Sequence, residues 1–240
     1  MYEERFYRSI SKPNDLLCYE VKIKETDLWC CTKTDLQKVI QDKAFHYRHQ
    51  LEEYIQSRPS FKESLTPIGQ DPFAPNIVKE MISASAQVGV GPMATVAGAI
   101  AEFLGRDISA MTDEFIIENG GDISIKTLRE RMALVYAKKS PFSQKIAIRL
   151  KAKDEPYGIC TSSATVGPSL SHGKADAVCI MADSALFADG LATRIGNSVK
   201  SKDDIALAIE TGKVFPGIIG MLIVVGDNLG IWGDLEIIRV

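Results

Sequence analysis

The segment from residue 158 to residue 197 gathers small and polar side chains that could form a ligand site. Its first part carries three consecutive hydroxyl residues, Thr161, Ser162 and Ser163. Hydroxyl groups donate and accept hydrogen bonds, which suits the oxygens of a phosphate or a ribose. Cys160 directly precedes them, and two interpretations of it stay open: a small buried thiol at a strand end, or a reactive thiol.

A helix that opens with Ser184 carries the second feature, because Ser is a favoured N-cap residue. On this helix Asp189 and Thr193 are four residues apart, so they share one face. A carboxylate and a hydroxyl on one face offer two oxygen ligands to a hard cation such as Mg²⁺. They also have a structural interpretation, in which both side chains bond to nearby backbone groups.

A third feature is the sequence Asn119-Gly120-Gly121-Asp122, which follows a strand predicted over 114–118. Two glycines at a strand end allow positive φ angles and leave the backbone uncovered. The pattern is typical of a hairpin turn, since 123–126 resumes as a strand. It also suits a ligand-facing loop in which Asn119 and Asp122 form hydrogen bonds.

The helices and strands that must position these residues occur along the chain in groups of one type. Helices are predicted over 36–57, 76–88, 92–104 and 201–211, in addition to the one that begins at Ser184. Further strands are predicted over 4–10, 17–23, 27–31, 133–137, 145–151, 177–182, 220–225, 229–232 and 235–240. Runs of strands and helices that do not alternate strictly favour an α+β fold with largely antiparallel sheets flanked by helices. The order is compatible with an internal duplication, and we expect one domain over residues 1–240.

Composition excludes several classes of protein. The net charge of −3 lacks the basic excess of a general nucleic-acid binder. The first ten residues lack the apolar stretch of a signal peptide, and the run over 217–225 is too short to span a bilayer. The five cysteines are odd in number and form no zinc-ligand spacing, so no disulfide framework is expected. These features predict a cytoplasmic protein without nucleic-acid or membrane partners.

Three of these segments resemble, in the same order, the ApbE flavin transferases. Asn119 to Asp122 resembles their Gly-Gly-Asp signature, and Thr161-Ser162-Ser163 resembles their Thr-Ser-Gly segment. The stretch ADSALFADGLATRI over 182–195 resembles their C-terminal Ala-Asp-x-x-x-Thr helix motif. The likeness covers about residues 88–199. It is closest to a subgroup of small ApbE-like proteins of unassigned function.

The resemblance implies a flavin (FAD or FMN) and Mg²⁺ as cofactors, and transfer of FMN to a hydroxyl as the family reaction. By the same resemblance, Asp189 and Thr193 match the metal-holding motif. Gly120, Gly121 and Asp122 match the loop beside the cofactor, which Thr161 and Ser162 also adjoin. Ser163 and Asn119 complete the expected cofactor-binding set.

The chain departs from the flavin transferases where they carry a His-x-x-Asp-Pro segment. That region holds Ser171-His172-Gly173 instead, so His172 is a candidate general base or a surface histidine in a turn. The Lys of the family's Lys-Gly helix is replaced by Ala97, which precedes Gly98. The third residue of Thr-Ser-Gly is Ser163.

Three functions follow as alternatives. The first is binding of a phosphorylated small molecule, flavin or another nucleotide, with Mg²⁺, as in an ApbE-like transferase. The second is a role in sulfide assimilation or homocysteine formation, which the subgroup resemblance implies. In it Cys160 carries or receives sulfur, and a nearby helix N-terminus or His172 activates its thiol. The third is a non-catalytic assembly protein whose exposed strands pair in a homodimer or a higher homo-oligomer.

Overall fold

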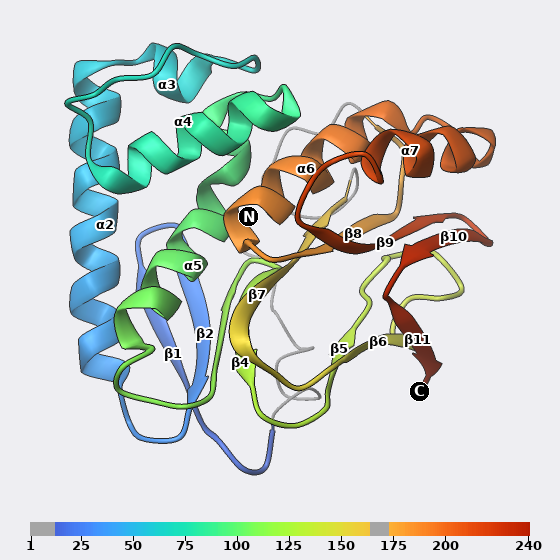
Figure 1. Ribbon diagram of the computed structural model, residues 1–240, viewed down its shortest axis with the longest axis horizontal. Helices are drawn as coiled ribbons and strands as arrows, with labels where there is room; N and C mark the ends of the chain where they lie inside the picture. The colour runs from blue at the N-terminus through green and yellow to red at the C-terminus, as the bar shows by residue number, and fades with distance from the viewer. Residues whose placement is uncertain (1–12, 164–172) are drawn as a thin grey trace.

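The computed structural model describes residues 13–163 and 173–240 (Figure 1). The strand predicted over 4–10 and the candidate base His172 lie outside these residues. The described strands form two sheets, in which every strand pairs antiparallel with its neighbours.

The larger sheet has eight strands in the order β1-β2-β3-β4-β7-β8-β9-β10. Their bounds are β1 Leu17–Ile23, β2 Thr26–Thr32, β3 Phe115–Asn119, β4 Asp122–Thr127, β7 Lys153–Ser162, β8 Ala177–Ala182, β9 Ile218–Val225 and β10 Asn228–Gly233. The smaller sheet has the order β11-β6-β5. Its strands are β5 Arg131–Leu134, β6 Ile146–Leu150 and β11 Glu236–Arg239.

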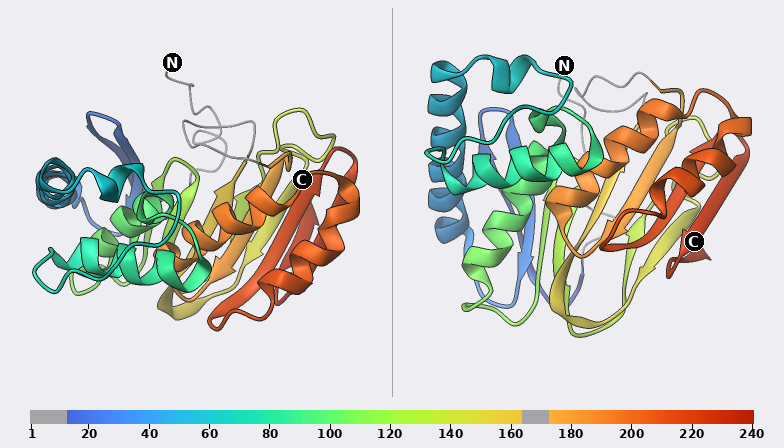
Figure 2. Two further views of the ribbon diagram at one scale, coloured as in Figure 1. Left: turned by 90° about the horizontal axis from the view of Figure 1, so that it is seen from above. Right: turned by 45° about the horizontal axis from the view of Figure 1, so that its top comes forward.

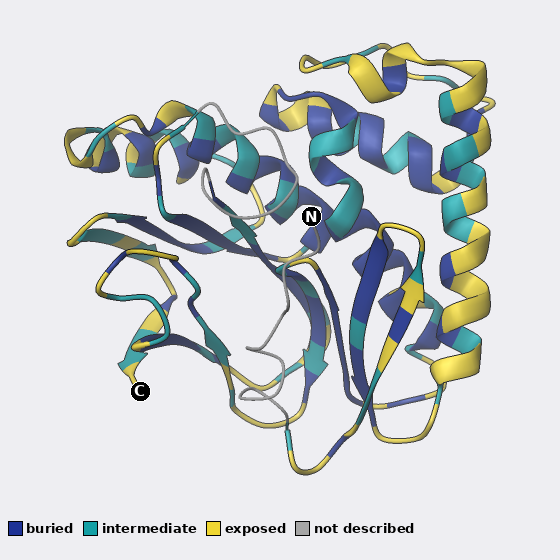
Figure 3. Cartoon of the chain, turned by 180° about the vertical axis from the view of Figure 1, so that it is seen from behind, coloured by how far each residue is buried: buried dark blue, intermediate teal, exposed yellow. Residues whose placement is uncertain are grey.

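Helices cover one face of the large sheet, and the small sheet lies on the other (Figures 1 and 2). The α-helices are α2 Gln37–Ser57, α3 Ser60–Glu63, α4 Asn76–Val88, α5 Val96–Ile108, α6 Ala185–Ser198 and α7 Ile205–Gly212. Two short 3-10 helices, η1 Pro92–Thr95 and η2 Lys202–Asp204, precede α5 and α7. The long helix α2 stands at one end of the molecule and exposes its outer side (Figure 3).

The core has parts on both faces of the large sheet. Two clusters lie beneath the helices, around α4 and α5 and around α6. The third cluster packs the large sheet against the small one, with Ile125 and Leu222 on one side and Ile148 on the other. Side chains that alternate along each strand supply both faces, which explains why Cys30 and Cys31 enter different clusters.

The predicted α+β class with antiparallel sheets is confirmed, and most elements agree within a few residues. The sequence did not predict β7 as a strand over Lys153–Ser162, because Asp154, Glu155 and Pro156 at its start are typical of a turn. Helix α4 begins at Asn76, as the predicted range 76–88 has it, and Pro75 is its N-cap residue.

The expectation that no disulfide forms is wrong for one pair. Cys18 on β1 and Cys31 on β2 are directly opposite each other in the strand register, with their Cα atoms 4.1 Å apart, and their sulfurs are bonded. The count of five cysteines could not reveal this pairing, because it depends on the register of two strands. Cys30, Cys160 and Cys179 are free and buried.

Among residues 13–163 and 173–240, no single helix is long and apolar enough to cross a membrane. The segments Asn76–Val88 and Pro92–Ile108 reach that length and composition only together, and they are bent by 101° relative to each other.

A cluster of charged side chains links Glu114, the residue before β3, to Arg131, the first residue of β5. The Glu114 carboxylate is buried and contacts Lys33 at 2.6 Å and Arg131 at 3.3 Å, while Arg131 also binds Asp15 through two bonds of 3.0 Å. The hydrogen bonds and charge of Arg131 lower the pKa of Asp15 to about 2. Burial raises the pKa of Glu114, but hydrogen bonds from Lys33, the Leu128 N–H and Thr127, with the Arg131 charge, outweigh it and lower that pKa to about 2.

This cluster predicts a loss of stability in acid. Both carboxyl pKa values are depressed in the folded state, so their contribution is complete above the unfolded values near 4 and is lost as the pH falls towards 2. We expect the free energy of urea unfolding to decrease between pH 4.5 and pH 2.5. An Asp15→Asn variant should start less stable and show a smaller decrease over that window. An equal slope in both proteins would contradict this assignment.

Candidate functional site

The glycines at 120 and 121 form the two-residue turn of the β3–β4 hairpin. Both have positive φ, 71° and 106°, and Asn119 lies opposite Asp122 in the register. Two positive φ angles are what a type I′ hairpin turn requires, so glycine is needed here. The Gly121 N–H donates to the Glu118 carboxylate at 2.8 Å, which holds the turn. The hairpin interpretation is therefore confirmed, and the turn places Asp122 at the first position of β4.

Asp122 connects the hairpin to the end of β7. Its side chain is buried, and its Oδ1 accepts a hydrogen bond of 3.2 Å from the Thr161 N–H. The structure thus joins two of the three segments that the sequence grouped, the Gly-Gly-Asp turn and the hydroxyl run.

Helix α6 brings in the third segment. Ser184 caps it as predicted, since its hydroxyl accepts from the Phe187 N–H at 3.2 Å. Asp189, one turn into the helix, accepts a 2.9 Å hydrogen bond at Oδ2 from the Gly98 N–H in the first turn of α5. This places the Asp189 carboxylate at the N-terminal end of α5, where helix dipoles favour negative charge.

The two aspartates interact electrostatically. Burial and the charge of Asp122 raise the pKa of Asp189 well above its usual value, against the lowering effect of the hydrogen bonds from Gly98 and Ala97. Two carboxylates that share one buried site repel each other, and a bound cation relieves that repulsion. The Asp122 and Asp189 side chains offer carboxylate oxygens, the kind of ligand that Mg²⁺ prefers. Within the described residues, no three His, Cys, Asp or Glu side chains gather as a metal site.

The face of α6 that carries Asp189 and Thr193 lies against the end of β7. Gly196, one turn beyond Thr193, approaches Ser162 so closely that a Cβ on it would lie 3.3 Å from the Ser162 hydroxyl. Asp189, Thr193 and Ser162 are therefore on the same side of the large sheet. Strand alternation puts Thr161 on the other side, where its hydroxyl donates to the Cys179 sulfur at 3.2 Å. Only the backbone of Thr161 takes part in the site.

Cys160 is fully buried and interacts electrostatically with both aspartates. Its thiol donates a hydrogen bond of 3.1 Å to the Ala185 carbonyl, the first residue of α6. Burial, followed by the charges of Asp122 and Asp189, raises the thiol pKa well above its usual value. These surroundings favour the protonated form, and they support the interpretation of Cys160 as a packed thiol rather than a nucleophile.

The other predicted site residues are Asn119, Ser163 and His172. The Asn119 amide donates to the Ala97 carbonyl at 3.2 Å, so it anchors the start of α5. Ser163 directly follows the last residue of β7, and its side chain is buried. His172 lies outside the described residues.

Sequence reasoning did not identify Gly98 and Glu102 as parts of this arrangement. Gly98 donates to Asp189, and the Glu102 carboxylate accepts from the Ser184 hydroxyl at 2.7 Å and from the Leu186 N–H at 3.0 Å. The small residues Ala97, Gly98, Ala99 and Ala101 of α5 are compatible with close packing, but the sequence does not reveal their partner. The available sign for Glu102 was an acidic residue within the otherwise apolar stretch 96–104.

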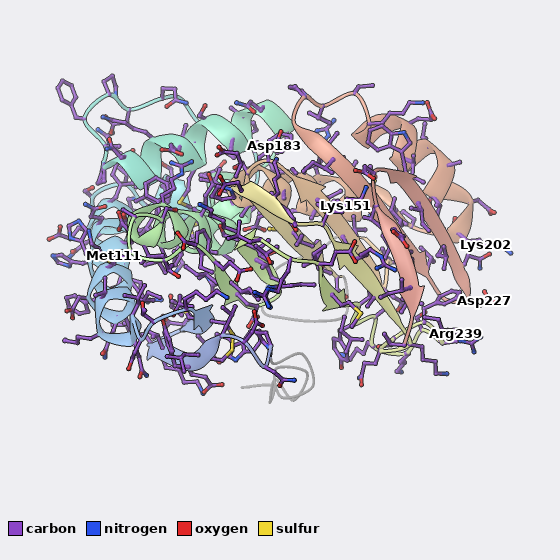
Figure 4. All side chains as sticks on the ribbon, turned by 60° about the horizontal axis from the view of Figure 1, so that its bottom comes forward. Met111, Lys151, Asp183, Lys202, Asp227 and Arg239 are labelled. Carbon is purple, nitrogen blue, oxygen red and sulfur yellow. A yellow bond between two sulfur atoms is a disulfide. The ribbon has the colours of Figure 1, made fainter. Side chains whose placement is uncertain are left out.

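Two surface hollows lie at the beginning of α6, with volumes of about 300 and 220 Å³. Asp183 lines both, and Arg106 and Tyr157 line the smaller one. Asp183 is labelled in Figure 4, where its side chain is at the upper edge of the sheet. The predicted site residues do not line either hollow.

The family model described as AbpE bacteria matches residues 8–213. The UPF0280 protein of Methanocaldococcus jannaschii is 41% identical over 193 residues, which cover 78% of this chain and 78% of that protein. The UPF0280 protein of Methanocella arvoryzae is 33% identical over 220 residues, which cover 91% of this chain and 89% of that protein.

Two solved structures have a similar fold. The apo form of the flavinyl transferase ApbE from Pseudomonas stutzeri superposes with a TM-score of 0.60 at 12% identity, covering 90% of this chain and 94% of that one. The flavin transferase ApbE from Vibrio cholerae gives 0.57 at 15% identity, with 92% and 97% covered. The chain therefore belongs to the AbpE bacteria family and is an ApbE-like protein of the UPF0280 group.

Proposed function

We propose that this protein binds a phosphorylated small molecule, flavin or another nucleotide, together with Mg²⁺. Asp189 and Thr193 on α6 would hold the cation, with the Asp122 carboxylate close by. The observation that carries the proposal is the meeting of Asp122 and Asp189 at one buried site, beside the first turn of α5. Two such carboxylates are costly to keep together unless a cation accompanies them.

The surroundings support a ligand with phosphate groups. Bound Mg²⁺ supplies positive charge that bridges and neutralises phosphate oxygens. The hydroxyl of Ser162 is on the same side of the sheet as Asp189 and can hydrogen-bond a phosphate or ribose oxygen. The Gly120-Gly121 turn exposes backbone beside Asp122, and a Cβ on Gly121 would meet nothing within 4 Å, so a ligand can approach it.

Group transfer is the reaction type that this site suits, because phosphoryl chemistry needs mainly positioning and charge neutralisation. The structural neighbours named flavin transferases support flavin as the first ligand to test. In such a transfer, Asp189 and Thr193 would orient the phosphates through the cation, and Gly98 would hold the Asp189 carboxylate in place by its N–H. A hydroxyl acceptor would come from the second substrate, and transfer of the FMN part of FAD to it would break the pyrophosphate bond and release AMP.

The test is a binding titration of the purified protein with FAD, FMN and ADP, with and without Mg²⁺. We expect tight binding of at least one nucleotide to require Mg²⁺, and an Asp189→Asn variant to lose at least tenfold in affinity, or about 1.4 kcal/mol. Nucleotide retained in native mass spectra of the purified protein would support the same conclusion.

Asp154→Asn is the matched control. Asp154 is an exposed β7 aspartate whose contact is a surface ion pair with Lys126 at 3.1 Å, and such pairs contribute little. It should bind as the unmodified protein does. If no nucleotide binds with Mg²⁺, or if Asp189→Asn binds as tightly as Asp154→Asn, the proposal is wrong.

A sulfur-carrying role for Cys160 has weaker support. The thiol is buried, donates to the Ala185 carbonyl and has a raised pKa, all of which disfavour the thiolate. We therefore propose nucleotide and Mg²⁺ binding as the function to test first.

A further inference from the structure

Helices α5 and α6 lie side by side over β4 and β7 (Figure 1), and one peptide group in the first turn of α5 is bonded to both α6 and β3. Its N–H, on Gly98, donates to Asp189 Oδ2 at 2.9 Å. Its C=O, on Ala97, accepts from the Asn119 side-chain amide at 3.2 Å. Because a peptide group is planar, a bond that fixes the C=O also fixes the direction of the N–H. Asn119 therefore orients the group that donates to Asp189.

Asn119 is also next to the other carboxylate. It is the last residue of β3 and lies opposite Asp122 in the strand register, and the Gly120-Gly121 turn joins the two residues. Its side chain is buried. The hairpin fixes Asp122 relative to Asn119, and the Asn119 amide fixes the peptide that holds Asp189. A continuous series of contacts therefore runs between two carboxylates that interact electrostatically.

The two hydrogen bonds of this peptide reinforce each other. A C=O that accepts a hydrogen bond polarises its peptide group, so the N–H of that group becomes a stronger donor. A stronger donor stabilises the negative charge of Asp189, which is the form that a cation binds. An amide at 119 does this without adding charge beside the two aspartates.

Other contacts hold α5 in place without Asn119. One turn further on, the Glu102 carboxylate accepts from the Ser184 hydroxyl and the Leu186 N–H at the start of α6. Gly105 lies directly on β3, since a Cβ there would be 2.7 Å from the Phe115 ring. Removing the Asn119 amide should therefore leave the packing of α5 intact and release mainly one peptide group.

We propose that Asn119 is a positioning residue of the cation site, which holds the Asp189 carboxylate in the orientation that binds Mg²⁺ by fixing the peptide between Ala97 and Gly98. The inference rests on the cation-binding part of the proposed function. It assigns the Asn119 amide to cation affinity, whereas the role predicted from the sequence is direct contact with the cofactor.

The test is a titration of the full chain with Mn²⁺ alone, in which electron paramagnetic resonance measures the free ion. Mn²⁺ takes the same oxygen ligands as Mg²⁺, so added Mg²⁺ should displace it. Asn119→Ala, and Asn119→Leu, which keeps the approximate side-chain shape, should each raise the Mn²⁺ dissociation constant about tenfold, as is usual for residues that orient a metal ligand. Asn119→Gln keeps an amide donor and should lose less affinity than either.

Thr112→Val is the matched control, because Thr112 lies just ahead of β3, at the end away from Asn119. Its buried hydroxyl donates to the Glu114 carbonyl at 2.8 Å and accepts from the Lys33 N–H at 3.3 Å. Losing these bonds should lower the melting temperature, as losing the Asn119 amide should, but it should leave the Mn²⁺ affinity unchanged. Mn²⁺ affinity therefore separates a positioning role from a purely structural one.

Three results overturn the inference. The first is an unmodified protein that binds no Mn²⁺, and the second is equal Mn²⁺ affinity in the Thr112→Val variant and the two Asn119 variants that lack the amide. The third is a nucleotide affinity at saturating Mg²⁺ that falls as far in Asn119→Ala as the Mn²⁺ affinity does, since the amide would then contact the nucleotide itself.

The same measurements keep this inference apart from the proposed function. Mn²⁺ binding that depends on Asn119, in a protein that binds no nucleotide, would support the inference and contradict the proposed function. Nucleotide binding that requires Mg²⁺, in a protein whose Mn²⁺ affinity does not depend on Asn119, would do the reverse.

Discussion

Replacing Gly98 by alanine is expected to destabilise the protein by about 3 kcal/mol, which is at the upper end of overpacking effects. A Cβ at this position would lie 2.3 Å from the Ala185 carbonyl oxygen and 2.9 Å from the Asp189 Cβ. The conflict is with backbone and with the base of a side chain, so no rotamer change relieves it. Helices α5 and α6 would have to separate where they cross. For a chain of this length, the loss corresponds to a decrease of about 6–12 °C in Tm.

The same substitution should weaken Mg²⁺-dependent nucleotide binding, because moving α6 away from α5 lengthens the bond from the Gly98 N–H to Asp189. Thermal unfolding and the binding titration measure the two effects on one protein. Gly69→Ala is the matched control, since a Cβ there meets nothing within 4 Å and the residue has no positive φ. Equal melting temperatures for the two variants would show that the α5–α6 crossing tolerates the extra carbon, contrary to this expectation.

Replacing Glu102 by alanine is the second change with a large expected effect. Its buried carboxylate accepts hydrogen bonds from the Ser184 hydroxyl and the Leu186 N–H at the start of α6, and it forms an ion pair with Arg106. Removing it leaves buried donors without an acceptor and removes negative charge from a helix N-terminus. We expect a loss of about 2–4 kcal/mol in the free energy of unfolding.

Urea unfolding measures this loss, and two variants sharpen it. Glu102→Gln keeps an acceptor oxygen and the side-chain shape, so it should lose only about 1 kcal/mol. Glu80→Ala removes the more exposed carboxylate partner of Arg106 and should change stability by less than about 0.5 kcal/mol. If Glu102→Ala were no more harmful than Glu80→Ala, the carboxylate would not hold α6 in the way its contacts indicate.

Local patterns predicted much of the fold. The strand over 177–182, the Ser184 cap and the glycine turn at 120–121 agree with the structure because each depends on neighbouring residues alone. Alternation along a strand and capping at a helix start are short-range effects, so they can be seen in the sequence. Strand β7 was missed for the same reason, since its first residues are charged and include a proline, and pairing with β4 and β8 is what extends it.

The candidate site was predicted as three segments, and the structure decides which side chains of those segments meet. Thr161 and Ser162 are neighbours in sequence, yet the pleat of β7 sends their hydroxyls to opposite faces of the sheet. The Cys18–Cys31 bond likewise depends on the register of β1 against β2. Neither fact follows from residue type or spacing, because each depends on how strands align.

By itself, the sequence determined that Asp189 and Thr193 share a helix face and that Asp122 follows a tight glycine turn. Their types and spacing are enough for those statements, since helix and hairpin geometry are local. Only the tertiary structure decided that Asp122 and Asp189, 67 residues apart in the chain, come near enough to interact electrostatically, and that Asp189 accepts from the Gly98 N–H. That meeting depends on the packing of α5 and α6 against the sheet, where glycines at 98 and 158 let backbones approach.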